Sequence, residues 1–278
     1  MDDNSVIVVY KGDTTSLVVH KESTDYISNC ITRTKKFYEA LLLAYLQEHY
    51  REQKTIIDIG ANIGNHTVFF AKYMDCKTVI SFEPFRKNFE LLQQNTTLYQ
   101  EKCTLYENAL SSSYGIRQLY CSEPQNFGGI SLEKEEKSEL VHDNVFVYPL
   151  DMFKFEEVTM IKIDVENHEH DVLIGAIDTI NKYKPIIILE NSHHYFKNLF
   201  TDPEPHKAIM EDLHYVKKAS NVCGSSMDLW VPDESCRVGH ALPMKKPHLI
   251  PSYSYSYSSN YALGIIGFLY ITLFFLHV

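Results

Sequence analysis

The stretch Thr55 to Gly64, T-I-I-D-I-G-A-N-I-G, constrains the fold of this chain most strongly. Three isoleucines surround a single acid, Asp58, and the run ends in a turn with glycines at Gly60 and Gly64. Residues 65–74 then follow a helical pattern, so a strand, a tight turn and a helix start are predicted in quick succession. Glycine has no Cβ and the first helical N–H groups lack internal partners, so a ligand can approach this backbone closely. We expect a nucleotide-like cofactor at this turn.

The rest of the central region alternates between strand and helix patterns. Predicted strands cover 78–82, 103–107, 158–165 and 185–190, predicted helices cover 85–99, a segment through 172–180 and 203–213, and two closing strands cover 215–219 and 227–231. Repeated units of this kind predict an α/β fold, with a mostly parallel sheet and helices on both faces. Antiparallel pairing of the two closing strands is left open.

The flanking segments have different patterns. Residues 1–50 are predicted to form an N-terminal extension that covers the domain entrance, with a β-hairpin at 6–10 and 17–20 and a helix at 37–49. Residues 111–150 contain scattered glycines and a charge run, which favours a solvated loop or a hairpin insertion. We place the main domain at 51–235 and a linker at 236–260.

Residues 261–278 form an uncharged, strongly apolar segment. As a helix it would span about 27 Å, close to the roughly 30 Å hydrocarbon core of a bilayer. We therefore expect a single-pass C-terminal membrane anchor, with a Ser/Tyr-rich spacer before it. A hydrophobic tail that packs on its own domain or on a partner is the alternative.

Charge and cysteine usage indicate which partners and which cellular compartment to expect for the protein. A formal net charge of -10 and the lack of a long Lys/Arg run argue against nucleic acid as a partner. Six scattered cysteines without a C-x-x-C motif indicate reduced thiols, and the acidic N-terminus is unlike a signal peptide. The N-x-T sites at Asn65 and Asn95 include one beside the glycine turn, where a glycan would interfere. These observations favour a catalytic domain on the cytoplasmic side of the membrane.

Several predicted strands end in an acid or an amide. Ligands of open parallel sheets bind outside the carboxyl ends of the strands. Residues at those ends are Asp58, Gly60, Glu83, Asn108, Asp164, Glu166, Glu190 and Asn191. Glu83 follows Gly60 by 23 residues, a spacing that suits a carboxylate that binds a ribose diol. The turn lacks the G-x-G-x-x-G pattern typical of pyrophosphate binding, which disfavours NAD and favours S-adenosylmethionine.

Five segments in order, I-D-I-G-A-N-I-G-N-H-T, I-S-F-E-P, N-A-L, I-K-I-D-V-E-N-H-E and K-P-I-I-I-L-E, resemble the FkbM family of S-adenosylmethionine-dependent methyltransferases. The resemblance covers about residues 54 to 191 and implies a class I, Rossmann-like methyltransferase fold with a seven-stranded sheet whose last strand is antiparallel. It also implies O-methylation of sugars, glycans or other small hydroxylated acceptors. By position, the resemblance assigns Asp58, Gly60, Asn62 and Gly64 to the methionine end of the cofactor, Glu83 to its ribose and Asn108 to the vicinity of its adenine.

One position departs from the family pattern. The family usually reads I-D-V-E-G, whereas this chain has Asn167 in place of the glycine. If the backbone requires a positive φ at this position, asparagine is the least costly replacement. The substitution affects the acceptor side more than the cofactor side.

Candidate catalytic residues cluster after the fourth and fifth strands of the core. A methyl transfer to oxygen requires alignment of the two substrates and removal of the hydroxyl proton. The candidates for proton removal are Asp164, Glu166, His168 and His193. A helix N-cap or a surface position is the alternative for Asp164, and with 13 histidines in the chain His168 and His193 could be chance neighbours. Asp164, Glu166 and a histidine could instead hold a divalent cation. No metal is part of the main prediction.

Two other functions remain open from the sequence. A chain that keeps this fold without catalysis could act as an interaction module. An NAD-dependent oxidoreductase would use the same ribose-binding acid, although its glycine pattern would differ.

Overall fold

The computed structural model describes residues 4–21, 24–191 and 206–237 of the chain. Residues Met1–Arg237 form one compact unit. Within the described part, no helix has the length and apolar character needed to cross a bilayer. The predicted anchor at 261–278, nearly all of the predicted linker and His193 lie outside the described residues.

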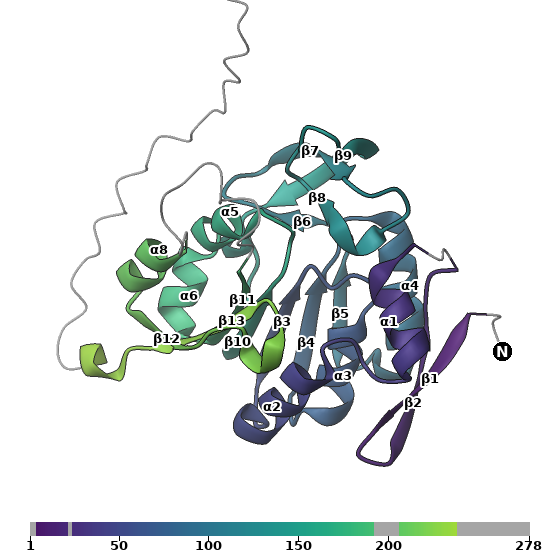
Figure 1. Ribbon diagram of the computed structural model, residues 1–278. Coiled ribbons are helices and arrows are strands. Elements are labelled where there is room, and N and C mark those ends of the chain that lie inside the picture. The colour runs from purple at the N-terminus through teal and green to yellow at the C-terminus, as the bar shows by residue number, and fades with distance from the viewer. Residues whose placement is uncertain (1–3, 22–23, 192–205, 238–278) are drawn as a thin grey trace, which may run out of the picture. The chain divides into compact units, whose positions relative to one another are not determined.

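A seven-stranded sheet forms the centre of this unit (Figure 1). Its strands are β3 (Thr55–Ile59), β4 (Thr78–Phe82), β5 (Cys103–Tyr106), β10 (Val158–Ile163), β11 (Ile186–Glu190), β12 (Tyr215–Ala219) and β13 (Met227–Pro232). The spatial order is β12-β13-β11-β10-β3-β4-β5, and only β13 runs against its neighbours. This arrangement confirms the expected mostly parallel sheet with an antiparallel last strand.

Helices cover both faces of the sheet, as predicted. The α-helices are α1 (Tyr26–Thr34), α2 (Ala40–Tyr50), α3 (Asn65–Tyr73), α4 (Arg86–Thr96), α5 (Glu169–Ile174), α6 (Ile177–Tyr183) and α8 (Lys207–Asp212). Side chains alternate along β3, so Ile56 packs in one apolar cluster with α2 and α3, whereas Ile57 packs in a second cluster with α5 and α6. Each fully buried isoleucine contributes about 1.5–3 kcal/mol to folding.

The helix predictions require two corrections, one to a predicted helix and one for a helix that was missed. The segment through 172–180 forms two helices because the chain turns at Gly175, where a Cβ would lie only 2.1 Å from the Ser111 carbonyl oxygen. The apolar spacing continues across this break and therefore hides it. Helix α1 was not predicted; the buried Asp25 caps it by accepting a hydrogen bond from the Ser28 N–H at 2.8 Å.

Residues 109–148 contribute a separate four-stranded sheet, which confirms the hairpin alternative for this region (Figure 1). Its strands are β6 (Ala109–Leu110), β7 (Gly115–Cys121), β8 (Ile130–Ser131) and β9 (Glu139–Tyr148). The β7–β9 pair is antiparallel. Leu119, Phe127 and Val147 help to form a small apolar core of this region. We call this region the insertion sheet.

The N-terminal hairpin confirms its prediction and packs against the main domain. It consists of β1 (Ser5–Tyr10) and β2 (Asp13–Val18). The Asn95 side chain accepts a hydrogen bond from the Val18 N–H at 2.6 Å and donates to the Ile63 carbonyl at 2.7 Å. The hairpin is thereby connected to the turn after β3. Short 3-10 helices complete the described chain at Thr97–Tyr99, Phe127–Gly129, Leu150–Met152, Val222–Gly224 and Glu234–Arg237.

Candidate active site

A pocket lies at the carboxyl ends of the central strands. Seven of the predicted site residues line it, namely Gly60, Asn62, Glu83, Asn108, Asp164, Glu166 and His168. Asp58 and Gly64 are not among the residues that line the pocket: Asp58 lies within β3, and Gly64 ends the turn and precedes α3. The structure therefore brings together residues that are more than 100 positions apart in the sequence.

The turn after β3 requires its two glycines. Gly60 has a φ of +77°, and a Cβ there would lie 1.8 Å from the Asp164 carbonyl oxygen. Gly64 has a φ of +86°, and its Cβ would lie 2.8 Å from Leu92 Cδ1. Any larger residue at Gly60 would displace the end of β10, so this glycine permits the close approach that forms one wall of the pocket.

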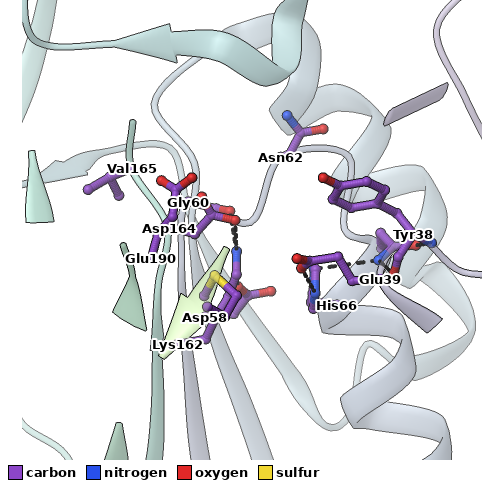
Figure 2. A network of polar contacts seen from close by, with 12 residues as sticks. Tyr38, Glu39, Asp58, Gly60, Asn62, His66, Lys162, Asp164, Val165 and Glu190 are labelled. Carbon is purple, nitrogen blue, oxygen red and sulfur yellow. Dashed lines mark hydrogen bonds and ion pairs between the residues drawn. The ribbon is translucent and has the colours of Figure 1, made fainter. Parts of the chain in front are cut away.

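A buried lysine organises the base of the pocket (Figure 2). Lys162 Nζ lies 3.4 Å from Asp58 Oδ1 and 3.2 Å from Asp164 Oδ2, and it donates a hydrogen bond to the Gly60 carbonyl at 3.0 Å. Burial alone would lower the pKa of Lys162, but Asp164 and Asp58 outweigh it and raise the pKa. Asp58 also accepts a hydrogen bond from Thr67 Oγ1 at 2.6 Å. Asp58 therefore acts on the turn through Lys162, which sequence reasoning missed.

Glu83 lies at the end of β4, where the ribose-binding carboxylate was predicted. Its two oxygens accept hydrogen bonds from the Asn62 N–H at 2.8 Å and from the Phe85 N–H at 2.9 Å. Burial raises the pKa of Glu83 to about 7, although these backbone hydrogen bonds oppose the shift. Each carboxylate oxygen can accept more than one hydrogen bond, so Glu83 retains the capacity to bind a diol.

Three carboxyl groups meet on the wall formed by β10 and β11. Oxygen atoms of Asp164, Glu166 and Glu190 all lie within 4.8 Å of one another. Burial and the charge of Asp164 raise the pKa of Glu166 to about 8 and that of Glu190 well above its ordinary value. The pKa of Asp164 is lowered because Lys162 outweighs the effect of its burial. We call Asp164, Glu166 and Glu190 the acidic cluster; no histidine of the described part of the chain belongs to it, and such a cluster does not by itself define a metal site.

The acidic cluster is followed by an unusual backbone segment. Glu166 and Asn167 have φ values of 55° and 74°. The expected reason for asparagine at position 167 is therefore confirmed, because this residue tolerates the left-handed region better than most. Ser131 Oγ of the insertion sheet donates a hydrogen bond to the Glu166 carbonyl.

His168 connects the insertion sheet to the main domain. Its Nδ1 lies 2.7 Å from Glu133 Oε1 and its Nε2 lies 3.0 Å from Ser111 Oγ. This order of groups resembles that of a hydrolase triad, but Ser111 is fully buried and its N–H donates to the Tyr148 carbonyl. Both nitrogens of His168 are thus engaged, which favours a structural role. Sequence analysis did not identify Glu133 as a partner of His168, because Glu133 lies in a charge run that is typical of solvated loops.

The sheet topology, the glycine turn and the carboxylate after β4 together define a class I methyltransferase. The chain belongs to the methyltransferase FkbM domain family, whose profile matches residues 58–217, more than half of the chain. The cofactor is S-adenosylmethionine. The residues fit it, because Glu83 offers a buried acceptor for the ribose and Gly60 leaves the turn open to the ligand.

Comparison with solved structures finds other methyltransferases. Methyltransferase FkbM from Methylobacillus flagellatus is 17% identical with a TM-score of 0.46, and the match covers 75% of this chain and 55% of that chain. This chain thus spans just over half the length of that protein. Precorrin-6y C5,15-methyltransferase from Geobacter metallireducens is 12% identical, with a TM-score of 0.39 and coverages of 66% and 74%. TYW2 from M. jannaschii, solved in complex with AdoMet, is 13% identical, with a TM-score of 0.37 and coverages of 83% and 85%. A search of curated proteins finds no match.

Proposed function

We propose that this protein is an S-adenosylmethionine-dependent O-methyltransferase that acts on a hydroxyl group of a sugar, a glycan or another small hydroxylated compound. The observation that carries the proposal is the acidic cluster beside Gly60, in the same pocket as the ribose-binding Glu83. Hydroxyl groups donate hydrogen bonds to carboxylates, and a polyol can occupy several acceptors at once.

Holding the cofactor falls to four residues of the pocket. Glu83 accepts hydrogen bonds from the ribose hydroxyls, Asn62 supports Glu83 through its N–H, and Gly60 provides the close backbone approach. Asn108 also lines the pocket and is assigned to the vicinity of the adenine. When bound, the cofactor supplies a methyl group on a positively charged sulfur. The negative charge of Asp164, whose pKa is lowered by Lys162, suits this cation.

Removal of the hydroxyl proton is assigned to Glu166. Its carboxyl group lines the pocket and has a pKa of about 8, close to the value that an effective general base needs near neutral pH. When bound, the cofactor would give its methyl group to the acceptor oxygen with cleavage of the sulfur–methyl bond and would leave as S-adenosylhomocysteine, while the hydroxyl proton would pass to the Glu166 carboxylate. Asp164 is held by Lys162 and is a weaker base. His168 is less suitable because both of its nitrogens are engaged.

The proposal is tested with methyl-labelled cofactor and a panel of acceptors that share a ring but differ in the reacting group. We expect label transfer to neutral polyols, recovered as a methyl ether by mass spectrometry, and little transfer to uronic acids, since the ionised Asp164 carboxylate would repel an acceptor carboxylate. Glu166→Gln should lower the rate roughly 100-fold or more and should retain binding of S-adenosylhomocysteine. Glu136→Gln, an exposed change in the insertion sheet region, is the matched control.

The pH dependence provides a second readout of the same proposal. The base must be ionised to act, so kcat/KM should rise with pH through about 8, and Glu166→Gln should remove this rise. Methylation of amines alone would contradict an O-methyltransferase. Binding of S-adenosylhomocysteine without transfer to any hydroxyl acceptor would favour the inert interaction module.

A further inference from the structure

A further carboxylate faces the same pocket from the opposite side, and it comes from the N-terminal extension. Glu39 lines the pocket, and Figure 2 shows its side chain across from Lys162 and Asp164. Its Oε2 lies 3.1 Å from His66 Nε2, and both side chains are less than one-tenth exposed. These two atoms contact each other, and neither has a further hydrogen-bond partner among the described residues. The pair therefore retains unused hydrogen-bonding capacity at the pocket wall.

The backbone fixes Glu39 in this position. Asn65, the first residue of α3, accepts a hydrogen bond from the Tyr38 N–H at 2.9 Å and donates to the Tyr38 carbonyl at 3.1 Å. His66 is the next residue of the same helix, which starts directly after Gly64. The carboxylate of Glu39 is thus held by the helix that follows the cofactor turn, although 27 residues separate Glu39 from His66 in sequence.

The side chain of Glu39 does not serve its own helix. Glu39 precedes α2 with a φ of 54°, and it makes no capping hydrogen bond to α2. A non-glycine residue rarely adopts this conformation. Among the described residues, its only ion-pair contact is His66. A buried carboxylate requires compensating partners, and the contact with His66 leaves Glu39 able to accept further hydrogen bonds.

The order of the strands indicates which part of the cofactor reaches Glu39. Glu83 on β4 marks the ribose, and β3 and β10 lie next to β4 in that order. The methionine end therefore extends over Gly60 and Asp164. That end carries an ammonium and a carboxylate. Lys162 Nζ is occupied by Gly60 and two aspartates, so the wall nearest this end presents mainly negative charge.

We propose that Glu39 is a cofactor-binding residue whose carboxylate accepts a hydrogen bond from the methionine ammonium group of S-adenosylmethionine. His66 is the positioning residue that holds this carboxylate. The proposal rests on the cofactor and not on the identity of the methyl acceptor. It assigns part of the cofactor site to a segment that precedes the family match at residue 58.

Two ligands isolate the proposed contact. S-adenosylhomocysteine contains the ammonium group, whereas 5′-methylthioadenosine retains the adenosine and the thioether but lacks the amino acid. Calorimetry on the full chain should show that Glu39→Gln weakens S-adenosylhomocysteine roughly 10- to 100-fold, the usual effect of a lost charge-assisted hydrogen bond. Affinity for 5′-methylthioadenosine should change less than about twofold, because that ligand makes no contact with Glu39.

Control variants separate binding from folding. Glu48→Gln changes an exposed glutamate on α2 and should affect neither ligand. Glu39→Asp retains the charge and should recover part of the affinity. His66→Gln should weaken S-adenosylhomocysteine alone, and it should add little to Glu39→Gln because it acts through that residue.

The results that would overturn the proposal are specific. An equal loss of affinity for both ligands in Glu39→Gln would show that Glu39 only supports the fold. Unchanged affinity for S-adenosylhomocysteine would exclude the contact. Failure of the wild-type chain to bind S-adenosylhomocysteine would overturn the contact together with the cofactor, whereas absence of methyl transfer with normal binding would affect only the proposed acceptor.

Discussion

At the scale of single residues, the pocket is organised by charges that are buried in pairs. Lys162 is enclosed between Asp58 and Asp164, and it holds the Gly60 carbonyl in place. A buried charge that loses its partner is costly, because neither water nor another group compensates it. The shape of the glycine turn thus depends on Asp58, which never reaches the pocket itself.

Replacing Asp58 with asparagine tests this dependence. Asp58→Asn retains the shape of the side chain but leaves Lys162 with one carboxylate fewer, so the free energy of unfolding should fall by about 3 kcal/mol. Affinity for S-adenosylhomocysteine should also fall, because Lys162 would hold Gly60 less firmly. Urea unfolding and calorimetry provide the two measurements. Asp75→Asn, at an exposed position, is the control, and equal stability of the two variants would contradict the role of Asp58.

The sequence predicted those site residues that follow a strand directly. Gly60, Glu83 and Asp164 were found from the strand pattern and from the 23-residue spacing between the first two. Lys162 was missed because a lone lysine in an apolar strand is usually interpreted as solvent-facing. Glu39 was missed because its partner lies on another element, and no local pattern reports a contact between them.

At the scale of elements, the break between α5 and α6 allows the main domain to pack closely against the chain at Ser111, which leads into the insertion sheet. Gly175 packs against the Ser111 backbone, and its N–H bonds to the Asp171 carbonyl. Strand β4 was predicted with its observed bounds because turn residues limit it on both sides. The helix break could not be predicted, because its cause is a contact with residue 111, which is distant in sequence.

Replacing Gly175 with alanine should lower the stability of the protein, whereas a Gly→Ala change of this kind usually raises stability. Gly→Ala within or beside a helix normally stabilises a protein by about 0.5–1 kcal/mol. Gly175→Ala should instead destabilise it by about 2 kcal/mol or more, since the new Cβ would meet two backbones that cannot easily move. Gly129→Ala, whose Cβ would make only an ordinary contact at 3.7 Å, is the control in urea unfolding. A gain in stability for Gly175→Ala would show that the two segments can separate.

At the scale of the whole molecule, the pocket concentrates acids whose pKa values are raised in the folded chain. Burial raises the pKa of Glu83 and Glu169 to about 7 and that of Glu166 to about 8. In the unfolded chain these groups ionise near the ordinary glutamate pKa of 4.5. A raised folded-state pKa of an acid contributes stability that is present at low pH and is lost as the pH rises through the folded-state value.

The ligand-free protein should therefore become less stable from about pH 4.5, where these acids ionise in the unfolded chain, to about pH 8, the folded-state pKa of Glu166. S-adenosylmethionine carries a positive sulfur and S-adenosylhomocysteine does not, so the former should raise Tm more, and the difference should grow with pH. Thermal unfolding in matched buffers measures both effects. Glu190→Gln should flatten the pH dependence by removing one member of the acidic cluster. A Tm that stays constant or rises over this range would contradict the assigned pKa shifts.

The overall topology was accessible from the sequence, because alternating strands and helices restrict the sheet to few arrangements. The placement of the N-terminal extension was not accessible, since it depends on aromatic packing such as that of Tyr10 on Phe69, with ring centres 4.9 Å apart. The membrane anchor at 261–278 and the cytoplasmic position of the domain remain predictions.

The contact between the N-terminal extension and α3 has a practical consequence for fragments of this gene. Sequence similarity to the family begins at residue 58, whereas α3 buries Phe69 against Tyr10 and Phe37 from the preceding segment. A coding fragment that begins at residue 58 would yield a chain in which Phe69 loses its cover of Tyr10 and Phe37 and the pocket loses the wall that contains Glu39. Such a fragment is expected to aggregate on expression, and its inactivity would say nothing about the enzyme.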